Sequence, residues 1–99
     1  MRAITYRKYG FIVFKSHSGW IAYNTSKEFE KGHTHLCSKA SAECAVKFCC
    51  EGIVPHRATV YYLMSLQRLT LNKDYYNRLQ QRIDQINETK ERKSSGKIE

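Results

Sequence analysis

The sequence predicts a single α+β domain in which an N-terminal β-hairpin packs against three α-helices. Short runs of β-branched and aromatic residues occur before residue 37, whereas apolar residues at helical spacing dominate from residue 39 onward. A chain of 99 residues has room for one domain. Its composition, with 41% hydrophobic residues and one proline, is typical of a folded domain. We expect this domain to span residues 1–92.

Two strand-like runs, residues 10–15 and 20–24, flank the turn-forming residues 16–19. This arrangement predicts a β-hairpin. Residues 3–7 and 33–37 are candidates for two further short strands. Both hairpin strands carry apolar residues on either face, so we expect helices to cover at least part of the hairpin.

Polar residues 24–32 predict a loop with at most one helical turn, and the first long helix is expected at residues 39–51. Ser38 is placed to cap its N-terminus and Gly52 to end it. Pro55 is placed to open a second helix at residues 56–70. This helix is apolar on nearly all sides, which predicts that it forms the centre of the core.

A third helix is expected at residues 73–92, capped by Asn72 and followed by a disordered tail at 93–99. A narrow apolar stripe with heptad-like spacing runs along it: Tyr76, Leu79, Ile83 and Ile86. The default interpretation is that the stripe packs on the domain itself. The alternative is that it docks onto a second copy of the chain, giving a homodimer, or onto another protein.

The charge of the chain is high and uneven. Seventeen Lys+Arg against nine Asp+Glu give a net charge of +8, and the first 27 residues carry five basic residues and no acidic one. Such an excess favours binding to polyanions. It also serves solubility, so charge alone does not define a site.

Basic and aromatic residues alternate in the N-terminal region, which predicts contact with nucleic acid. Cations attract phosphates, and exposed rings stack on unpaired bases. The candidate phosphate contacts are Arg2, Arg7, Lys8 and Lys15, and the candidate stacking residues are Tyr9 and Trp20. The competing interpretation is that several of these aromatic side chains belong to a thin core.

The histidines and cysteines raise the question of a metal site. His33, His35 and Cys37 alternate and would share one face of a strand, and Cys49 or Cys50 could supply a fourth ligand. No paired-ligand spacing supports that interpretation, so we expect no metal or other cofactor, mostly buried free thiols and surface histidines.

No motif indicates catalysis. Two-histidine phosphoesterases need two H-x-T motifs on paired strands, whereas this chain has only one such segment, His33-Thr34-His35. No nucleophile elbow or phosphate-binding glycine loop is present. We therefore expect a chain that is not an enzyme and has no small-molecule substrate. With no apolar run long enough to span a membrane and no apolar leader, we expect a cytoplasmic location without membrane contact.

Four segments suggest a resemblance to known proteins: Tyr9-Gly10-Phe11-Ile12-Val13-Phe14, Gly32-His33-Thr34-His35, Tyr62-Leu63 and Ser65-Leu66-Gln67-Arg68-Leu69. Over about residues 6–85 the chain resembles small uncharacterised proteins of Gram-positive bacteria and of their phages or mobile elements. The resemblance implies no activity and no site residues. It implies a context in which small basic proteins bind nucleic acid, or bind and block a host or competitor protein. The sequence thus predicts a non-enzymatic binding or regulatory protein that contacts nucleic acid through its N-terminal hairpin, with protein binding through the last helix as the alternative.

Overall fold

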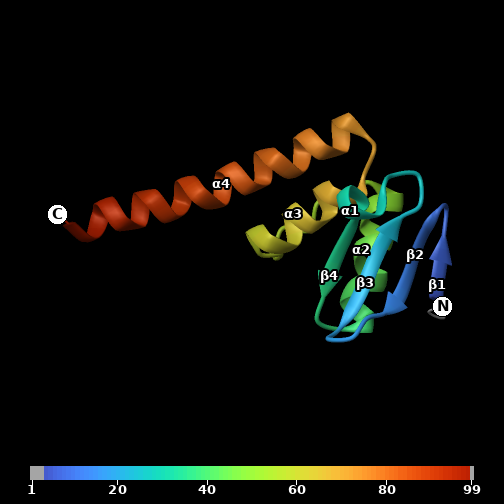
Figure 1. Cartoon of the computed structure of the whole chain (residues 1–99). Coiled ribbons are helices and arrows are strands. Elements are labelled where there is room, and N and C mark those ends of the chain that lie inside the picture. Colours follow the sequence, from blue (N-terminus) through green and yellow to red (C-terminus); the bar gives the residue numbers. More distant parts are fainter. Residues whose placement is uncertain (1–3, 99) are drawn as a thin grey trace.

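The computed structural model describes residues 4–98, with side chains described over residues 4–89, and it confirms the α+β fold. The described residues form four strands and four helices: a short helix precedes the fourth strand, and the three longer helices follow it (Figure 1). The strands are β1 (Ile4–Lys8), β2 (Phe11–Lys15), β3 (Trp20–Asn24) and β4 (His33–Leu36). The helices are α1 (Phe29–Gly32), α2 (Lys39–Glu51), α3 (Val60–Leu69) and α4 (Lys73–Ile98).

The strands form one antiparallel sheet in the order β1-β2-β3-β4, so each strand pairs with its neighbour in the chain. The predicted hairpin is confirmed: β2 and β3 pair from Phe11 opposite Asn24 to Lys15 opposite Trp20. The two further strands that the sequence allowed flank this hairpin, one on each side.

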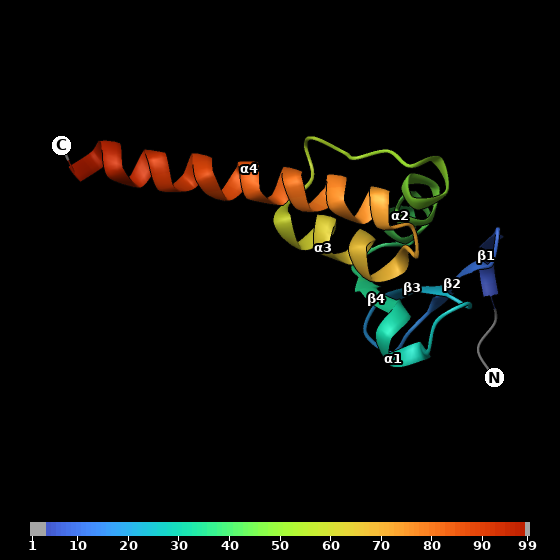
Figure 2. The same ribbon diagram turned by 90° about the horizontal axis from the view of Figure 1, so that it is seen from above.

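The helices divide between the two faces of the sheet. Figure 2 shows α2 and α3 over one face, α4 on the side of α3 away from the sheet, and the short α1 at the opposite face. One face is therefore covered by a helical layer, whereas among residues 4–98 the other face has only α1 beside it.

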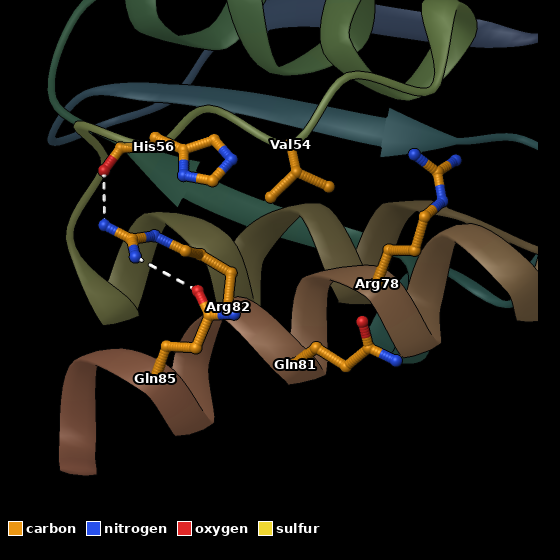
Figure 3. Close-up of a pocket in the computed structure, with 6 residues that line it drawn as sticks. All are labelled: Val54, His56, Arg78, Gln81, Arg82 and Gln85. Carbon is orange, nitrogen blue, oxygen red and sulfur yellow. Dashed lines mark hydrogen bonds between the residues drawn. The ribbon is translucent and has the colours of Figure 1, made fainter.

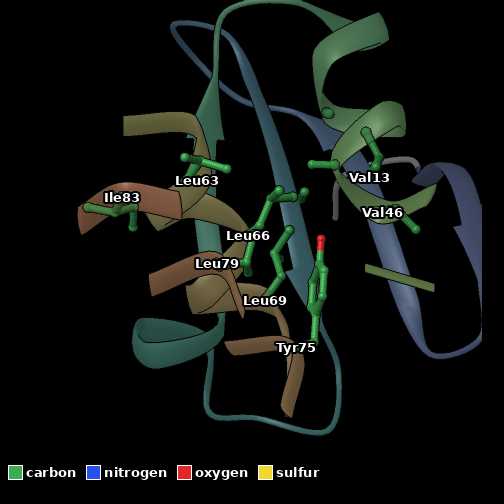
Figure 4. Close-up of a cluster of buried hydrophobic side chains, with 11 residues drawn as sticks. Val13, Val46, Leu63, Leu66, Leu69, Tyr75, Leu79 and Ile83 are labelled. Atoms are coloured by element: carbon green, nitrogen blue, oxygen red, sulfur yellow. The ribbon is translucent and has the colours of Figure 1, made fainter. Parts of the chain in front are cut away.

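The core lies between the sheet and the helical layer, and α3 is at its centre as predicted. Leu63, Leu66 and Leu69 on α3 are fully buried, and α3 packs against α2, α4, β3 and β4. Figure 4 shows these side chains in one cluster with Val13 from the sheet and Val46 from α2.

The helix boundaries test the capping predictions. Ser38 caps α2, since its Oγ accepts from the backbone N of Ser41 at 3.1 Å, and Gly52 ends α2 in the left-handed region at φ 68°. The prediction that Pro55 opens the next helix is wrong. Helix α3 begins at Val60, because Thr59 Oγ1 accepts from the backbone N of Tyr62 and so caps the helix later.

Helix α4 begins where predicted, with Asn72 Oδ1 accepting from the backbone N of Tyr75 at 3.0 Å. It continues to Ile98, past the expected end at Arg92. Figure 1 shows its C-terminal part extending beyond the body of the molecule. The disorder of residues 93–99 in solution stays a prediction. No helix within the described part of the chain has the length and apolar character needed to cross a membrane.

Candidate nucleic-acid interface

The sheet face away from α2 and α3 is here called the open face. Val13 and Ala22 are buried beneath the helices, so alternation along the strands turns their neighbours to the other side. The open face is formed by Arg7, Ile12, Phe14, Ile21, Tyr23, His33 and His35.

Aromatic rings gather on the open face around Phe29 of α1. Its ring stacks on His33 with centroids 4.2 Å apart and planes 5° from parallel, and meets Tyr23 edge-on at 5.2 Å. Phe14 lies 6.4 Å from Phe29, and His35 lies 5.0 Å from His33. These five side chains, Phe14, Tyr23, Phe29, His33 and His35, are called the ring cluster below.

The ring cluster has a buried base and an exposed top. Phe14 and the neighbouring Ile21 are only 8% and 3% exposed, although no long helix covers them. Phe29 is 44% exposed and His35 is exposed, whereas Tyr23 and His33 are half-buried. The cluster thus presents two aromatic rings to solvent above an apolar floor.

The segment that carries Phe29 is fixed to the end of α3 by hydrogen bonds. Asn24 Nδ2 donates to the Leu69 carbonyl at 2.7 Å, and Lys27 Nζ donates to the Arg68 carbonyl at 2.7 Å. Arg68 in turn donates from Nη2 to the Glu30 carbonyl at 2.6 Å. Side chains of residues 24 and 27 and the side chain of Arg68 therefore hold α1 against the end of α3.

Two basic residues near α1 serve this anchoring. Arg68 also donates from Nε to the His33 carbonyl at 2.9 Å. Burial lowers the pKa of Lys27, and the nearby positive charge of Arg68 lowers it further. Both side chains therefore help to anchor the segment around α1 through backbone carbonyls.

The structure separates the basic residues that the sequence grouped together. Arg7 is exposed on the open face, whereas Lys8 and Lys15 fall on the other side of the sheet in the β-strand alternation. Lys8 and Lys15 also lie at opposite ends of the hairpin, roughly 13 Å apart along the strand direction. Arg2 lies outside the described residues. Only Arg7 therefore shares a face with the ring cluster.

The two predicted stacking residues have different environments. Tyr9, in the β1–β2 turn, is 83% exposed and adopts a left-handed φ of 47°, with Lys8 Nζ 5.9 Å from its ring centroid. Trp20 is half-buried and packs against the hydrophobic core beneath the helices. The prediction for Trp20 as a free stacking surface is therefore wrong, because the core uses its ring, as the competing interpretation held.

Sequence reasoning missed Phe29, His33 and His35 as members of one aromatic surface. Phe29 sits in a segment expected to be a polar loop, and nothing local indicates that its ring folds back on β3 and β4. The alternation of His33 and His35 on a strand is visible in the sequence, but it suggests metal ligands there and not stacking rings.

The stripe on α4 is mostly core. Leu79 and Ile83 are 0% and 5% exposed within the hydrophobic core, and Ile86 packs against it. Only Tyr76, at 44% exposure, presents a large surface to solvent. A partner cannot reach Leu79 or Ile83 in this fold, so the stripe as a whole is not a docking surface.

All four cysteines are free thiols, but the expectation that most are buried is wrong. Cys37 and Cys44 are exposed, and Cys49 and Cys50 are half-buried. Cys49 donates to the Leu66 carbonyl at 3.7 Å, and burial, aided by Cys50, raises its pKa to about 12. A thiol in that environment is a poor nucleophile at neutral pH.

The segment at residues 33–35 is the candidate for a metal site. Nδ1 of His33 faces the Phe29 carbonyl, and Thr34 between the histidines is buried with its Oγ1 donating to Ser65 at 2.8 Å. Within the described residues, no three His, Cys, Asp or Glu side chains are grouped in a way that could hold a metal ion.

Comparison with known proteins gave no matching family model, no similar curated protein and no similar solved structure. The resemblance to small proteins of Gram-positive bacteria and their mobile elements stays a prediction.

Proposed function

We propose that this chain is a non-enzymatic binding module that contacts single-stranded nucleic acid across the open face of its sheet. The observation that carries the proposal is the ring cluster, which presents Phe29 and His35 to solvent on the sheet face that also carries Arg7 and that the long helices leave uncovered. Phe29 and His35 present rings that can stack on bases, and Arg7 is placed to contact a phosphate.

Single strands fit this surface better than duplexes. A ring can stack on a base only if that base has left its own stack, and unpaired bases offer their faces without that cost. The net charge of +8 supplies the long-range attraction, which does not depend on sequence. The open face thus adds a preference for strand type to a general attraction for polyanions.

The β1–β2 turn carries a further exposed ring. Tyr9 is largely exposed, and the ammonium group of Lys8 lies close to its ring. A strand that crosses the open face toward this turn would meet a third exposed ring, that of Tyr9, with the ammonium group of Lys8 beside it. Lys15 lies at the far end of β2, so it would contact only a longer nucleic-acid strand.

Fluorescence anisotropy with labelled single-stranded RNA, single-stranded DNA and duplex DNA tests the proposal at several salt concentrations. We expect tighter binding to a single strand, and an affinity that falls with salt. Arg7→Gln should reduce the slope of log K against log salt by about 0.7, the contribution of one phosphate contact on a single strand. His35→Ala should weaken binding by roughly 5- to 150-fold, as the loss of one base stack does.

Arg57→Gln is the matched control, because Arg57 is an exposed arginine in the α2–α3 loop, away from the open face. It removes the same charge but should leave the strand preference intact. Equal losses for Arg7→Gln and Arg57→Gln, or binding that salt does not weaken, would refute the proposed interface.

A second candidate, a protein-binding or inhibitor module, is favoured by a different observation. Met64 on α3 and Tyr76 on α4 are 49% and 44% exposed and line a common hollow with Lys27, Gln67 and Arg68. If this surface joins two copies, light scattering should show a dimer that Met64→Asp dissociates without unfolding. If the chain is a monomer at high concentration and Met64→Asp has no effect on its size, the homodimer hypothesis is refuted.

A further inference from the structure

A hollow of about 240 Å³ lies between the loop that follows α2 and the adjacent face of α4 (Figure 3). It is on the helical side of the molecule, away from the open face of the sheet. The residues that line it are Val54, His56, Arg78, Gln81, Arg82 and Gln85.

The lining is rich in hydrogen-bond donors and carries no carboxylate. Arg78 and Arg82 are four residues apart on α4, so they lie on one helix face with a rise of about 6 Å between them. Neither guanidinium forms an ion pair with an acidic side chain over residues 4–89. Two positive charges therefore border one small hollow without a bound counter-charge from the protein.

Both guanidinium groups are held in place by the wall of the hollow. Arg78 donates from Nη1 to the Gly52 carbonyl at 3.0 Å and lies 5.4 Å from the Tyr75 ring. Arg82 donates from Nη2 to the His56 carbonyl at 2.8 Å and from Nη1 to Gln85 Oε1 at 3.2 Å. Figure 3 shows the two Arg82 contacts and the imidazole of His56 above its side chain. A ligand would meet donors already oriented, which reduces the entropy lost on binding.

One of these donors is unsatisfied. Nε of Arg82 is fully buried and has no hydrogen-bond partner in the part of the chain whose side chains are described. Leaving a buried charged donor unpaired costs free energy, which is recovered if the Arg82 side chain shifts so that its Nε meets an acceptor in the hollow. Figure 3 shows the Arg78 and Arg82 guanidinium groups pointing toward opposite ends of the hollow, so an anion between them would lie in the field of both positive charges.

We propose that this hollow binds a phosphate group, either as the free anion or as the phosphate of a small phosphomonoester. A tetrahedral phosphate offers several oxygens in different directions, and guanidinium groups bind it with paired, charge-assisted hydrogen bonds. The side-chain amides of Gln81 and Gln85 are further donors at the rim. The volume is below the roughly 300–1,000 Å³ of sites for drug-sized molecules, so it suits a small anion.

The site is independent of the proposed nucleic-acid interface, because it uses other residues on another side of the molecule. The source of the phosphate group is either free inorganic phosphate or a phosphomonoester. Two probes distinguish these sources: potassium phosphate and phenyl phosphate. Tighter binding of phenyl phosphate indicates a phosphomonoester, and equal or weaker binding indicates free phosphate.

The experiment is a titration of the full chain with each probe, at constant ionic strength maintained with potassium chloride. The readout is the ¹H–¹⁵N spectrum of the arginine Nε–H groups. We expect the Arg82 Nε–H signal, identified by its loss in Arg82→Gln, to shift in a saturable way. Arg78→Gln should weaken binding by about tenfold to a hundredfold, the range for losing charge-assisted hydrogen bonds.

Arg7→Gln is the matched control, since Arg7 is an exposed arginine on the open face of the sheet. It should leave phosphate affinity unchanged while weakening nucleic-acid binding, and Arg78→Gln should do the reverse. If Arg82→Gln does not fold, the Arg78→Gln variant and the wild-type titration still decide the question.

The proposal is overturned if no arginine Nε–H signal shifts with phosphate beyond the effect of chloride. It is also overturned if Arg7→Gln weakens phosphate binding as much as Arg78→Gln does. If Arg78→Gln weakens oligonucleotide binding but not phosphate binding, this surface contacts the nucleic-acid backbone instead. That result would also overturn the proposed site for a small ligand.

Discussion

Replacement of Leu79 by alanine is the sharpest test of whether α4 belongs to the core or to a docking surface. Leu79 packs within the hydrophobic core and is 0% exposed to solvent. Removing most of its isobutyl group loses the transfer free energy and leaves a cavity, which together cost about 2–5 kcal/mol. For a domain of this size, each 1 kcal/mol lowers Tm by roughly 4–8 °C. A loss near 3 kcal/mol therefore lowers Tm by about 12–24 °C.

The measurement is urea and thermal unfolding followed by circular dichroism, with Tyr76→Ala as the control from the same helix. Tyr76 is 44% exposed, so its truncation should cost about 1 kcal/mol or less. The m-value should stay unchanged in both variants, because neither alters the surface that unfolding exposes by much.

The reasoning is refuted if Leu79→Ala and Tyr76→Ala are equally mild. That result would mean that Leu79 is not packed in the core. The stripe on α4 would then be available to a partner, as the alternative interpretation of the sequence requires.

Four further predictions concern the interior of the domain. Gly32→Ala should destabilise the fold by about 1–3 kcal/mol in urea unfolding, because a Cβ there would lie 2.6 Å from Lys27 Cβ; an unchanged midpoint would contradict the close approach. Asn24→Ala should cost about 1–3 kcal/mol by the same measurement, because it leaves a buried carbonyl at the end of α3 without its donor; a neutral result would mean that water replaces the side chain. Iodoacetamide at pH 8 should modify Cys37 on the order of 100-fold faster than Cys49, whose pKa is raised to about 12 by burial, and peptide mass spectrometry showing equal rates would contradict this. Because the unfolded chain releases the Cys49 proton at its ordinary pKa of about 8.5 and the folded chain keeps it to about 12, the free energy of unfolding should fall as pH rises between these values.

Local sequence signals were enough to predict most elements of the fold. The hairpin, the cap at Ser38, the left-handed Gly52 and the central position of α3 all follow from patterns within a few residues. The start of α3 does not, because Pro55 and Thr59 are both acceptable beginnings and only the packing of the α2–α3 loop chooses between them.

The candidate site was less predictable because it depends on which face each side chain takes. Arg7 and Lys8 are adjacent, so alternation alone separates them, and this signal was available in the sequence. The sequence does not show which side of the sheet the helices cover. That choice places Trp20 in the core, and the return of α1 brings Phe29 over the opposite face.

The order of the strands leaves β1 and β4 as the two edges of the sheet, and an edge strand can pair with another molecule through its free backbone groups. The irregular pairing between Ile4 and Tyr6 disrupts the regular ladder along β1, and Arg7 and Lys8 place two like charges on the same strand. At β4, the side chain of Arg68 already engages the His33 carbonyl. Bulges, edge charges and covered carbonyls are the means by which natural sheets resist aggregation. Replacing Arg7 and Lys8 with neutral residues should therefore promote pairing of β1 with other molecules and fibril formation, whether or not the open face binds a ligand.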